Sequence, residues 1–439
     1  MQKYLAAAHA LLYRRLRLKV LGSFSRSAIS RFLGLLMTYA SLLALPASAN
    51  SSTVAEVLML CYFYNAAGLV VNLGKDWDLK VNNNIDFSGL GLRRHLLVVF
   101  ACSSVIVAGL CVALLFAEPT NVFYSAFNFS QNPYALLLTL LALTLSGWSK
   151  LAISFCQRAS KSSVNFLLDA YPIMIVTIGI VLLRELGYVM HGAQALVAAA
   201  YCSQLIVAFI VAKRYTTAKR LVESPSASPL KRSSKYAYAS LSLSTVAVGL
   251  VINIAPSLFL GPKAYNYWSY ALRLSFVISL LPSIIYNQMP FNIHKQGVLW
   301  GEVLNSIRRR SLVCSTFSLI PVLIVALPFL QLVLSPSGGI SLSVKLILGV
   351  YLVILSEFAN VALGPNDFVL AFYGQENRVF QFRVLSLFVY MAIALLIASF
   401  ADAVFLVLAL ATVGQALTFN LLCMVESKKY LPYDKVESG

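Results

Sequence analysis

The chain has 439 residues, of which 59% are hydrophobic and only 11% are charged. Soluble domains carry roughly 25% charged residues, so this composition excludes an ordinary soluble enzyme and indicates a protein that lies in a lipid bilayer. The formal net charge of +18 also fits a nucleic-acid-binding protein. The placement of the basic residues along the chain decides between these two classes.

Twelve stretches are long and apolar enough to cross a bilayer as helices, which takes about 20 residues each. They are rich in Leu, Val and Ile and lack the alternation of transmembrane strands, so we expect an all-α polytopic membrane protein. Only Ala401 and Asp402 separate the last two stretches. The predicted spans are 28–46, 54–73, 96–117, 134–156, 164–183, 193–212, 237–260, 267–289, 312–334, 344–363, 384–400 and 403–424.

The basic residues gather in alternate loops between these spans. The N-terminal arm, the loops after even-numbered spans and the tail hold most of them, and the remaining loops hold Arg184, Lys263 and Lys345. Cytoplasmic loops are enriched in Lys and Arg, so the pattern predicts that both termini are cytoplasmic. We therefore interpret the charge mainly as a topology signal, with attraction of anionic lipid as a second role, and expect no nucleic-acid partner.

The segment 213–236 is basic and includes a Ser- and Pro-rich run, which is typical of a flexible linker. It divides the chain into two six-helix lobes, an organisation typical of transporters with a central cavity. The expected domains are a cytoplasmic basic arm 1–27, lobes 28–212 and 237–424, the linker, and a cytoplasmic tail 425–439.

The sequence Ala47-Ser48-Ala49 resembles a signal-peptide cleavage site. The basic arm and the apolar run before it are long for a signal peptide, so we expect the first helix to be retained.

Motifs for enzymatic chemistry are missing from the sequence. It contains no G-x-x-x-x-G-K-[ST] phosphate loop and no H-E-x-x-H, and its histidines and cysteines are scattered. We therefore expect no cofactor and no metal, and a transporter instead of an enzyme. The loops on the outer side are short, which argues against a polysaccharide polymerase with a large external catalytic loop.

Charged side chains inside membrane spans are costly and usually face a partner or a water-filled cavity. Glu357 lies near the centre of its span and favours a cavity position, with a structural ion pair as the alternative. Arg273 lies about two turns inside its span and suits an anionic substrate, although it could also reach the headgroups. Arg31, Lys150 and Asp169 lie nearer the cytoplasmic ends, where reaching to the headgroups is the alternative to a function.

A break follows Glu357 on the same predicted helix. Gly364-Pro365 interrupts the apolar pattern, which then resumes. Proline kinks a membrane helix and frees a carbonyl group, so Asn366 and Asp367 either line a break that faces the cavity or belong to an ordinary loop.

Three segments together resemble the O-antigen flippase family of the multidrug/oligosaccharidyl-lipid/polysaccharide exporter superfamily. Residues 260–274 with Leu281-Pro282 are similar to the family's "LGPxxxGxYSxAxRL" entry into helix 8, although Asn266 replaces the glycine of that pattern. Residues 371–378 look like the family's "LxAxGxxK" end of helix 10, and residues 184–193 resemble the turn between helices 5 and 6.

This resemblance implies a flippase in the bacterial inner membrane. Its substrate would be an undecaprenyl-diphosphate-linked oligosaccharide, moved by alternating access of the two lobes. Its partners would be this lipid-linked substrate, the bilayer, and the polysaccharide polymerase with its chain-length machinery.

The residue roles follow from this interpretation together with charge and depth in the membrane. Arg273, Lys150 and Arg31 would contact diphosphate or sugar, and Glu357, Asp169 and Asp367 would couple transport to protons or another cation. The alternative is a cation-coupled small-molecule or multidrug antiporter of the same superfamily, which a cavity lined by carboxylates would favour.

Overall fold

The computed structural model describes most of the chain as helices joined by turns, and it contains no strand in the described part. The described residues are 29, 32–73, 89–129, 134–158, 163–187, 193–218, 235–296, 300–334, 343–364, 366–372, 374–395 and 403–429. The predicted basic arm, most of the linker and the end of the tail lie outside these ranges. The proposed division into domains therefore stays a prediction.

Each of the twelve predicted spans contains a helix, which confirms the all-α fold class. In the described residues, six helices are long and apolar enough to cross a membrane, and shorter apolar helices accompany them. The helices are Phe32–Ser48, α2 Ser51–Val70, α4 Gly89–Leu115, α5 Val122–Ala126, α6 Ala135–Arg158, α7 Ser163–Glu185, α8 Gln194–Ala218, α9 Lys235–Phe259, α10 Pro262–Gln296, α11 Trp300–Leu334, α12 Val344–Ala362, α13 Asn366–Phe372, α14 Glu376–Ala394 and α15 Val404–Ser427.

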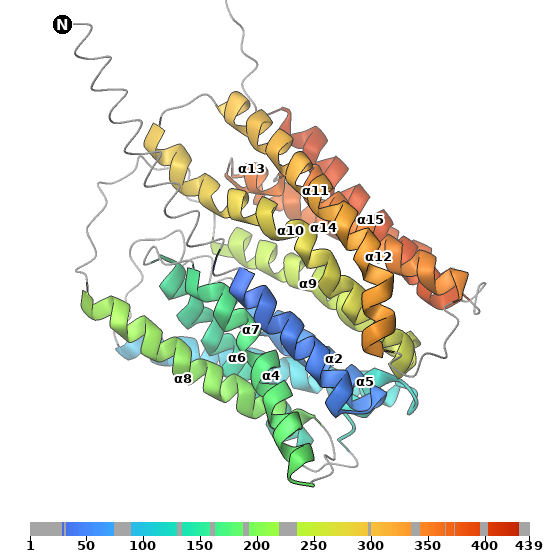
Figure 1. Ribbon diagram of the computed structural model, residues 1–439. Helices are drawn as coiled ribbons and strands as arrows, with labels where there is room; N and C mark the ends of the chain where they lie inside the picture. The colour runs from blue at the N-terminus through green and yellow to red at the C-terminus, as the bar shows by residue number, and fades with distance from the viewer. Residues whose placement is uncertain are drawn as a thin grey trace, which may run out of the picture.

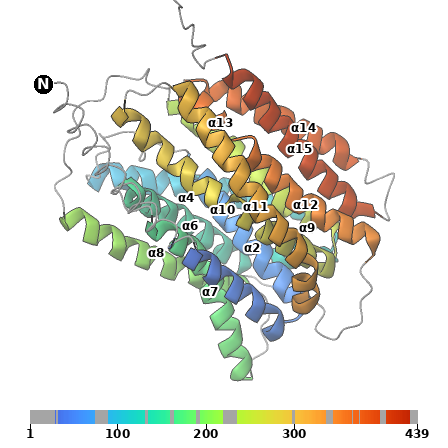
Figure 2. The same cartoon turned by 45° about the horizontal axis from the view of Figure 1, so that its top comes forward.

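The helices form two lobes, which Figure 1 shows as a blue-to-green set and a yellow-to-red set. Helices up to α8 pack mainly with one another, as do helices α9 to α15. The lobes meet where α2 packs against α9 and α10, at the centre of the bundle (Figure 2). Six-helix lobes of this kind leave room for a cavity at their boundary.

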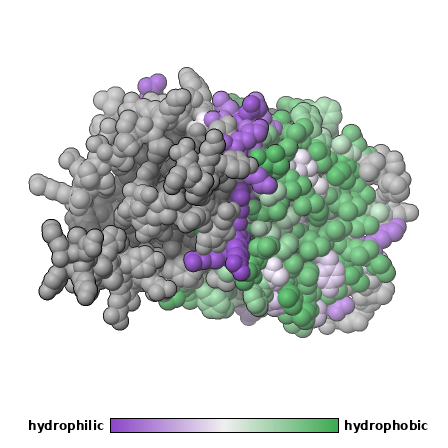
Figure 3. Space-filling model, turned by 90° about the horizontal axis from the view of Figure 1, so that it is seen from above, coloured by the Kyte–Doolittle hydropathy of each residue, from purple (hydrophilic) through white to green (hydrophobic). Residues whose placement is uncertain are grey.

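The outer surface of the second lobe is apolar. Figure 3 shows a broad hydrophobic area bordered by hydrophilic residues. Along α11, Phe317, Ile324 and Leu332 are 74%, 69% and 72% exposed. Exposed apolar patches of this size are rare on soluble proteins and are expected where lipid chains cover the surface.

Several prolines lie inside helices, and at two of them, Pro172 and Pro256, a side chain of a neighbouring helix donates to the carbonyl group that the proline frees. Pro172 in α7 cannot donate to the Leu168 carbonyl one turn earlier, and the Gln204 amide of α8 donates to that carbonyl instead, at 2.7 Å. Pro256 in α9 likewise frees the Ile252 carbonyl, which accepts from the indole N–H of Trp268 on α10, at 3.1 Å.

The predicted break after Glu357 is present. Helix α12 ends at Ala362, Gly364 adopts a φ of +86°, and the short helix α13 follows. A β-carbon at Gly364 would lie 2.7 Å from Cγ of Arg308 on α11, so both the backbone conformation and the space require glycine. The break turns Asn366 and Asp367 into the second lobe.

The first helix is part of the core. Leu42 and Leu45 of the Phe32–Ser48 helix are fully buried, and the Arg184 guanidinium donates to the Ala47 carbonyl. The candidate cleavage site thus directly follows a helix that packs inside the bundle.

We predict that Gln204→Leu destabilises the protein by about 1–3 kcal/mol, because the buried Leu168 carbonyl then loses its donor. Thermal unfolding in detergent measures the change. In a Pro172→Ala background the helix supplies its own N–H to that carbonyl, so the cost of Gln204→Leu should fall to well under half. Equal costs in both backgrounds would show that Gln204 does not compensate Pro172.

Candidate functional site

A cavity of about 420 Å³ lies between the two lobes. The Phe32–Ser48 helix, α2, α7 and α8 supply its wall from the first lobe, and α10 supplies the wall from the second. We call the end of the bundle where α2 begins the Ser51 end. The lining residues come from the middle of α2 and α10 and from the early part of α7, so the cavity lies away from the Ser51 end.

Arg273 on α10 brings a positive charge to this cavity. Its guanidinium carbon lies 4.6 Å from the centre of the Tyr62 ring, a cation–π contact that holds the group in place. The Tyr39 hydroxyl donates to the backbone carbonyl of Arg273 at 2.7 Å. Among the described lining residues there is no carboxylate.

Two donors beside the cavity have no hydrogen-bond partner in the described structure. They are Nε of Arg273 and the hydroxyl of Tyr62, and both atoms are buried. A buried donor without a partner costs free energy, and these two atoms are covered by protein in this structure. Asn65 and Ser279 add further polar groups to the same wall. The site can therefore bind a group with several acceptor oxygens and negative charge.

Glu357 on α12 lies behind the α10 wall of the cavity. Its carboxylate lies near the Ser279 side chain of α10, and Nδ2 of Asn360 donates to it at 3.4 Å. Asn420 of α15 in turn donates to Oδ1 of Asn360 at 3.0 Å. Polar side chains therefore connect Glu357, behind the α10 wall, through Asn360 of the same helix to Asn420 of α15.

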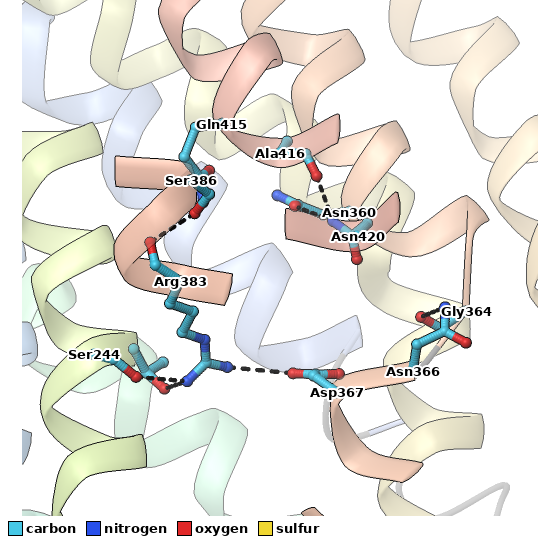
Figure 4. A network of polar contacts seen from close by, with 11 residues as sticks. Ser244, Asn360, Gly364, Asn366, Asp367, Arg383, Ser386, Gln415, Ala416 and Asn420 are labelled. Atoms are coloured by element: carbon cyan, nitrogen blue, oxygen red, sulfur yellow. Dashed lines mark hydrogen bonds and ion pairs between the residues drawn. The ribbon is translucent and has the colours of Figure 1, made fainter. Parts of the chain in front are cut away.

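Asp367 takes part in a separate network inside the second lobe, which Figure 4 shows. Its carboxylate pairs with the Arg383 guanidinium at 3.2 Å, and the two side chains are 28% and 11% exposed. Arg383 also donates to the hydroxyls of Ser244 and Thr245 on α9 and lies over the Phe419 ring of α15. The charge of Asp367 is thus compensated within the lobe, in a network that joins α9, α13, α14 and α15.

Three further predicted site residues remain, and the structure describes the side chain of one of them, Lys150. Lys150 lies half-buried on α6 and is not among the residues that line it. Asp169 belongs to α7, next to the lining residue Ala170, but its side chain lies outside the described part. Arg31 also lies outside the described residues. Of the predicted set, the structure brings Arg273 to the cavity and Glu357 close to it.

Sequence reasoning placed Arg383 in a cytoplasmic loop, and the structure corrects this placement. Helix α14 begins at Glu376, about two turns before the predicted span, so Arg383 lies inside the helix and is 9% exposed. Asp367 could have indicated this placement, because a carboxylate inside the membrane needs a cation nearby. The cavity tyrosines Tyr39, Tyr62 and Tyr201 were also missed, because aromatic residues are common in membrane helices.

Neither a protein-family model nor a curated protein sequence matches this chain. Solved structures of MATE transporters and related proteins of the MOP superfamily share its fold. A MOP superfamily transporter from Pyrococcus furiosus has 12% identity and a TM-score of 0.59 over 93% of this chain and 95% of its own. A Vibrio cholerae MATE transporter, solved as a point mutant, has 15% identity and a TM-score of 0.54 over 93% and 98%.

A third similar structure is the inward-facing conformation of a multidrug resistance MATE family transporter. It has 11% identity and a TM-score of 0.54 over 92% of this chain and 98% of its own. The chain thus shares the fold of MATE transporters and of a related MOP superfamily transporter.

We predict that Arg383→Ala lowers stability by about 2–4 kcal/mol, because Asp367 then lies half-buried without its cation. Lys429→Ala is the matched control, since it breaks the pair with Glu426 in which Lys429 is 64% exposed. Exposed pairs contribute about 0–1 kcal/mol, so the control should keep its midpoint of thermal unfolding in detergent. Equal effects of the two substitutions would contradict this role for Arg383.

Proposed function

We propose that this chain is a membrane transporter that moves amphipathic organic anions by alternating access of its two lobes. The observation that carries this proposal is the Arg273 guanidinium at a 420 Å³ cavity between the lobes, with no carboxylate among the described lining residues. Charge inside a membrane protein marks substrate pathways, and the volume suits a drug-sized ligand.

The contacts at the cavity suggest how such a substrate would bind. The negative group would pair with the Arg273 guanidinium, which the Tyr62 ring holds at the cavity. The apolar part would pack against Tyr39 and Phe276, which line the same cavity. A cationic substrate would meet repulsion from Arg273 in this low-dielectric setting.

The comparisons support a small-molecule exporter over the lipid-linked oligosaccharide flippase. Two similar structures are described as multidrug resistance MATE family transporters. The Pyrococcus furiosus protein is described as having a binding pocket of reverse polarity, which suggests a different function for it. A pocket of reversed polarity on this fold is consistent with the Arg273 cation at the cavity described above.

The flippase remains a second candidate because Arg273 also suits a lipid diphosphate. In that case the polysaccharide polymerase and the chain-length machinery would be the partners. For either substrate we propose the bacterial inner membrane, with both termini cytoplasmic as the basic loops predict. The cavity then lies toward the cytoplasm, and Glu357, reached through Ser279, is our candidate for coupling to protons.

We predict that Arg273→Ala lowers the affinity for a transported anion about tenfold to a hundredfold, the usual strength of charge-assisted hydrogen bonds. Arg273→Lys should lie between the alanine variant and the wild type, because it keeps the charge but loses the planar donors. The assay is uptake of fluorescent carboxylates and sulfonates, beside cationic dyes, into proteoliposomes.

The control for this assay is Arg378→Ala, which removes an exposed guanidinium from α14. A parallel assay follows the movement of a diphosphate-linked oligosaccharide lipid between leaflets. Uptake of cations that survives Arg273→Ala would overturn the anion proposal. Movement of the oligosaccharide lipid without uptake of free anions would establish the flippase instead.

We also predict that Glu357→Gln uncouples transport from the pH gradient, because the amide cannot take up a proton. An imposed pH gradient should accelerate uptake into proteoliposomes that contain the wild type, and it should leave uptake by the variant unchanged. Glu118→Gln, an exposed carboxylate between α4 and α5, is the control and should respond like the wild type. A variant that still follows the gradient would remove Glu357 from coupling.

A further inference from the structure

One face of α10 makes the hydrogen-bonded contacts between the lobes. Asn266, Tyr270 and Arg273 follow one another at helical spacings of four and three residues, so they share a face. That face runs antiparallel to the Phe32–Ser48 helix. Further along α10, Phe276, Ser279 and Leu280 line the cavity.

The hydrogen bonds across the lobe boundary follow this order. Nδ2 of Asn266 donates to the Ser51 backbone carbonyl at 2.9 Å and to the Ser51 hydroxyl at 3.1 Å. The Tyr270 hydroxyl donates to the Leu42 carbonyl at 2.6 Å. Asn266 is 3% exposed and Tyr270 is fully buried. These contacts, from Asn266 to Tyr270, form what we call the seal.

The seal separates the cavity from the Ser51 end. Asn266 lies about 10 Å from Arg273 along the helix axis, at 1.5 Å per residue. A small cavity of about 100 Å³, lined by Ser51, Lys263 and Asn266, lies at the outer side of the seal. In an alternating-access transporter these contacts must break when the substrate leaves toward this end.

We propose that Asn266 is the latch of the seal, whose release opens the cavity toward the Ser51 end. The inference rests on the alternating-access part of the proposed function and does not depend on the substrate. Tyr270 is fully buried within the seal. Asn266 lies at the end of the seal nearest Ser51 and joins the two lobes through a single amide group.

The chemistry of the Asn266 amide suits a reversible contact. Its Oδ1 has no hydrogen-bond partner in the described structure, so the latched state leaves half of the amide unsatisfied. When the lobes separate at this end, water can hydrogen-bond both Asn266 and Ser51. The exchange of protein bonds for water bonds keeps the sealed and open states close in free energy, as a gate requires.

The native Cys61 reports on the seal without any added label site. It lines the main cavity and is 7% exposed. A membrane-impermeant, charged thiol reagent added from the Ser51 end must pass the seal to reach it. We would add the reagent to right-side-out and to inside-out vesicles that hold the full chain. The rate of Cys61 modification is read by peptide mass spectrometry.

We expect Asn266→Ala to raise the rate of Cys61 modification from the Ser51 end about tenfold, the shift that the loss of ordinary hydrogen bonds gives. Asn266→Leu keeps the volume without a donor and should behave in the same way, should the alanine variant fold poorly. Asn253→Ala is the matched control, because its amide donates to the Gly249 carbonyl of its own helix α9.

An unchanged rate from the Ser51 end in both Asn266 variants, at wild-type thermal stability, would overturn the latch. An equal increase in the Asn253 control would do the same, since it would indicate general loosening. The assay uses no substrate, so failure of the anion proposal would leave the labelling result intact. If the latch proposal failed, the predicted effect of Arg273→Ala on anion uptake would still stand.

Discussion

The constraint on which this structure depends is that lipid offers no hydrogen bonds, so the helices must satisfy one another's freed backbone groups. Gln204 and Trp268 do so for the carbonyls released by Pro172 and Pro256. The positions of these two side chains are therefore explained by their structural role. Arg273 differs from these two residues, because its guanidinium lies over the Tyr62 ring at the cavity and compensates no proline.

Arg383 and Arg273, both in the second lobe, show the contrast most clearly. Arg383 has a carboxylate, Asp367, and hydroxyls of α9 around it, so its charge is neutralised inside the lobe. Arg273 has an aromatic ring beneath it and a cavity in front of it. A cation held by a ring keeps its charge available to a ligand, whereas a paired cation holds helices together. The two guanidinium groups carry the same charge, but their different surroundings suit one to packing helices together and the other to ligand binding.

Much of the fold follows from the sequence, because runs of apolar residues long enough to span a bilayer leave few alternatives to a helix. The start of the last helix near residue 403 was predicted for this reason, as was the break at Gly364. The start of α14 was placed too late because Arg383 looked like a loop residue, and only its distant partner explains it inside a helix. Charge and depth pointed to Arg273, but Tyr62 and Ser51 meet α10 through tertiary packing, which a single sequence does not encode locally.

The position of Arg273 on α10 would connect the proposed binding site to the proposed gate. The helix face that carries the cation also carries Asn266 and Tyr270, and the carbonyl of Arg273 itself accepts from Tyr39 of the opposite lobe. A ligand that engages the guanidinium therefore acts at the inner edge of the seal, about two turns from the Asn266 contact. Because helices resist bending within two turns, a small rotation of α10 at the ligand would move the seal as well. One rigid helix face can thus join the binding site to the barrier that the substrate must pass.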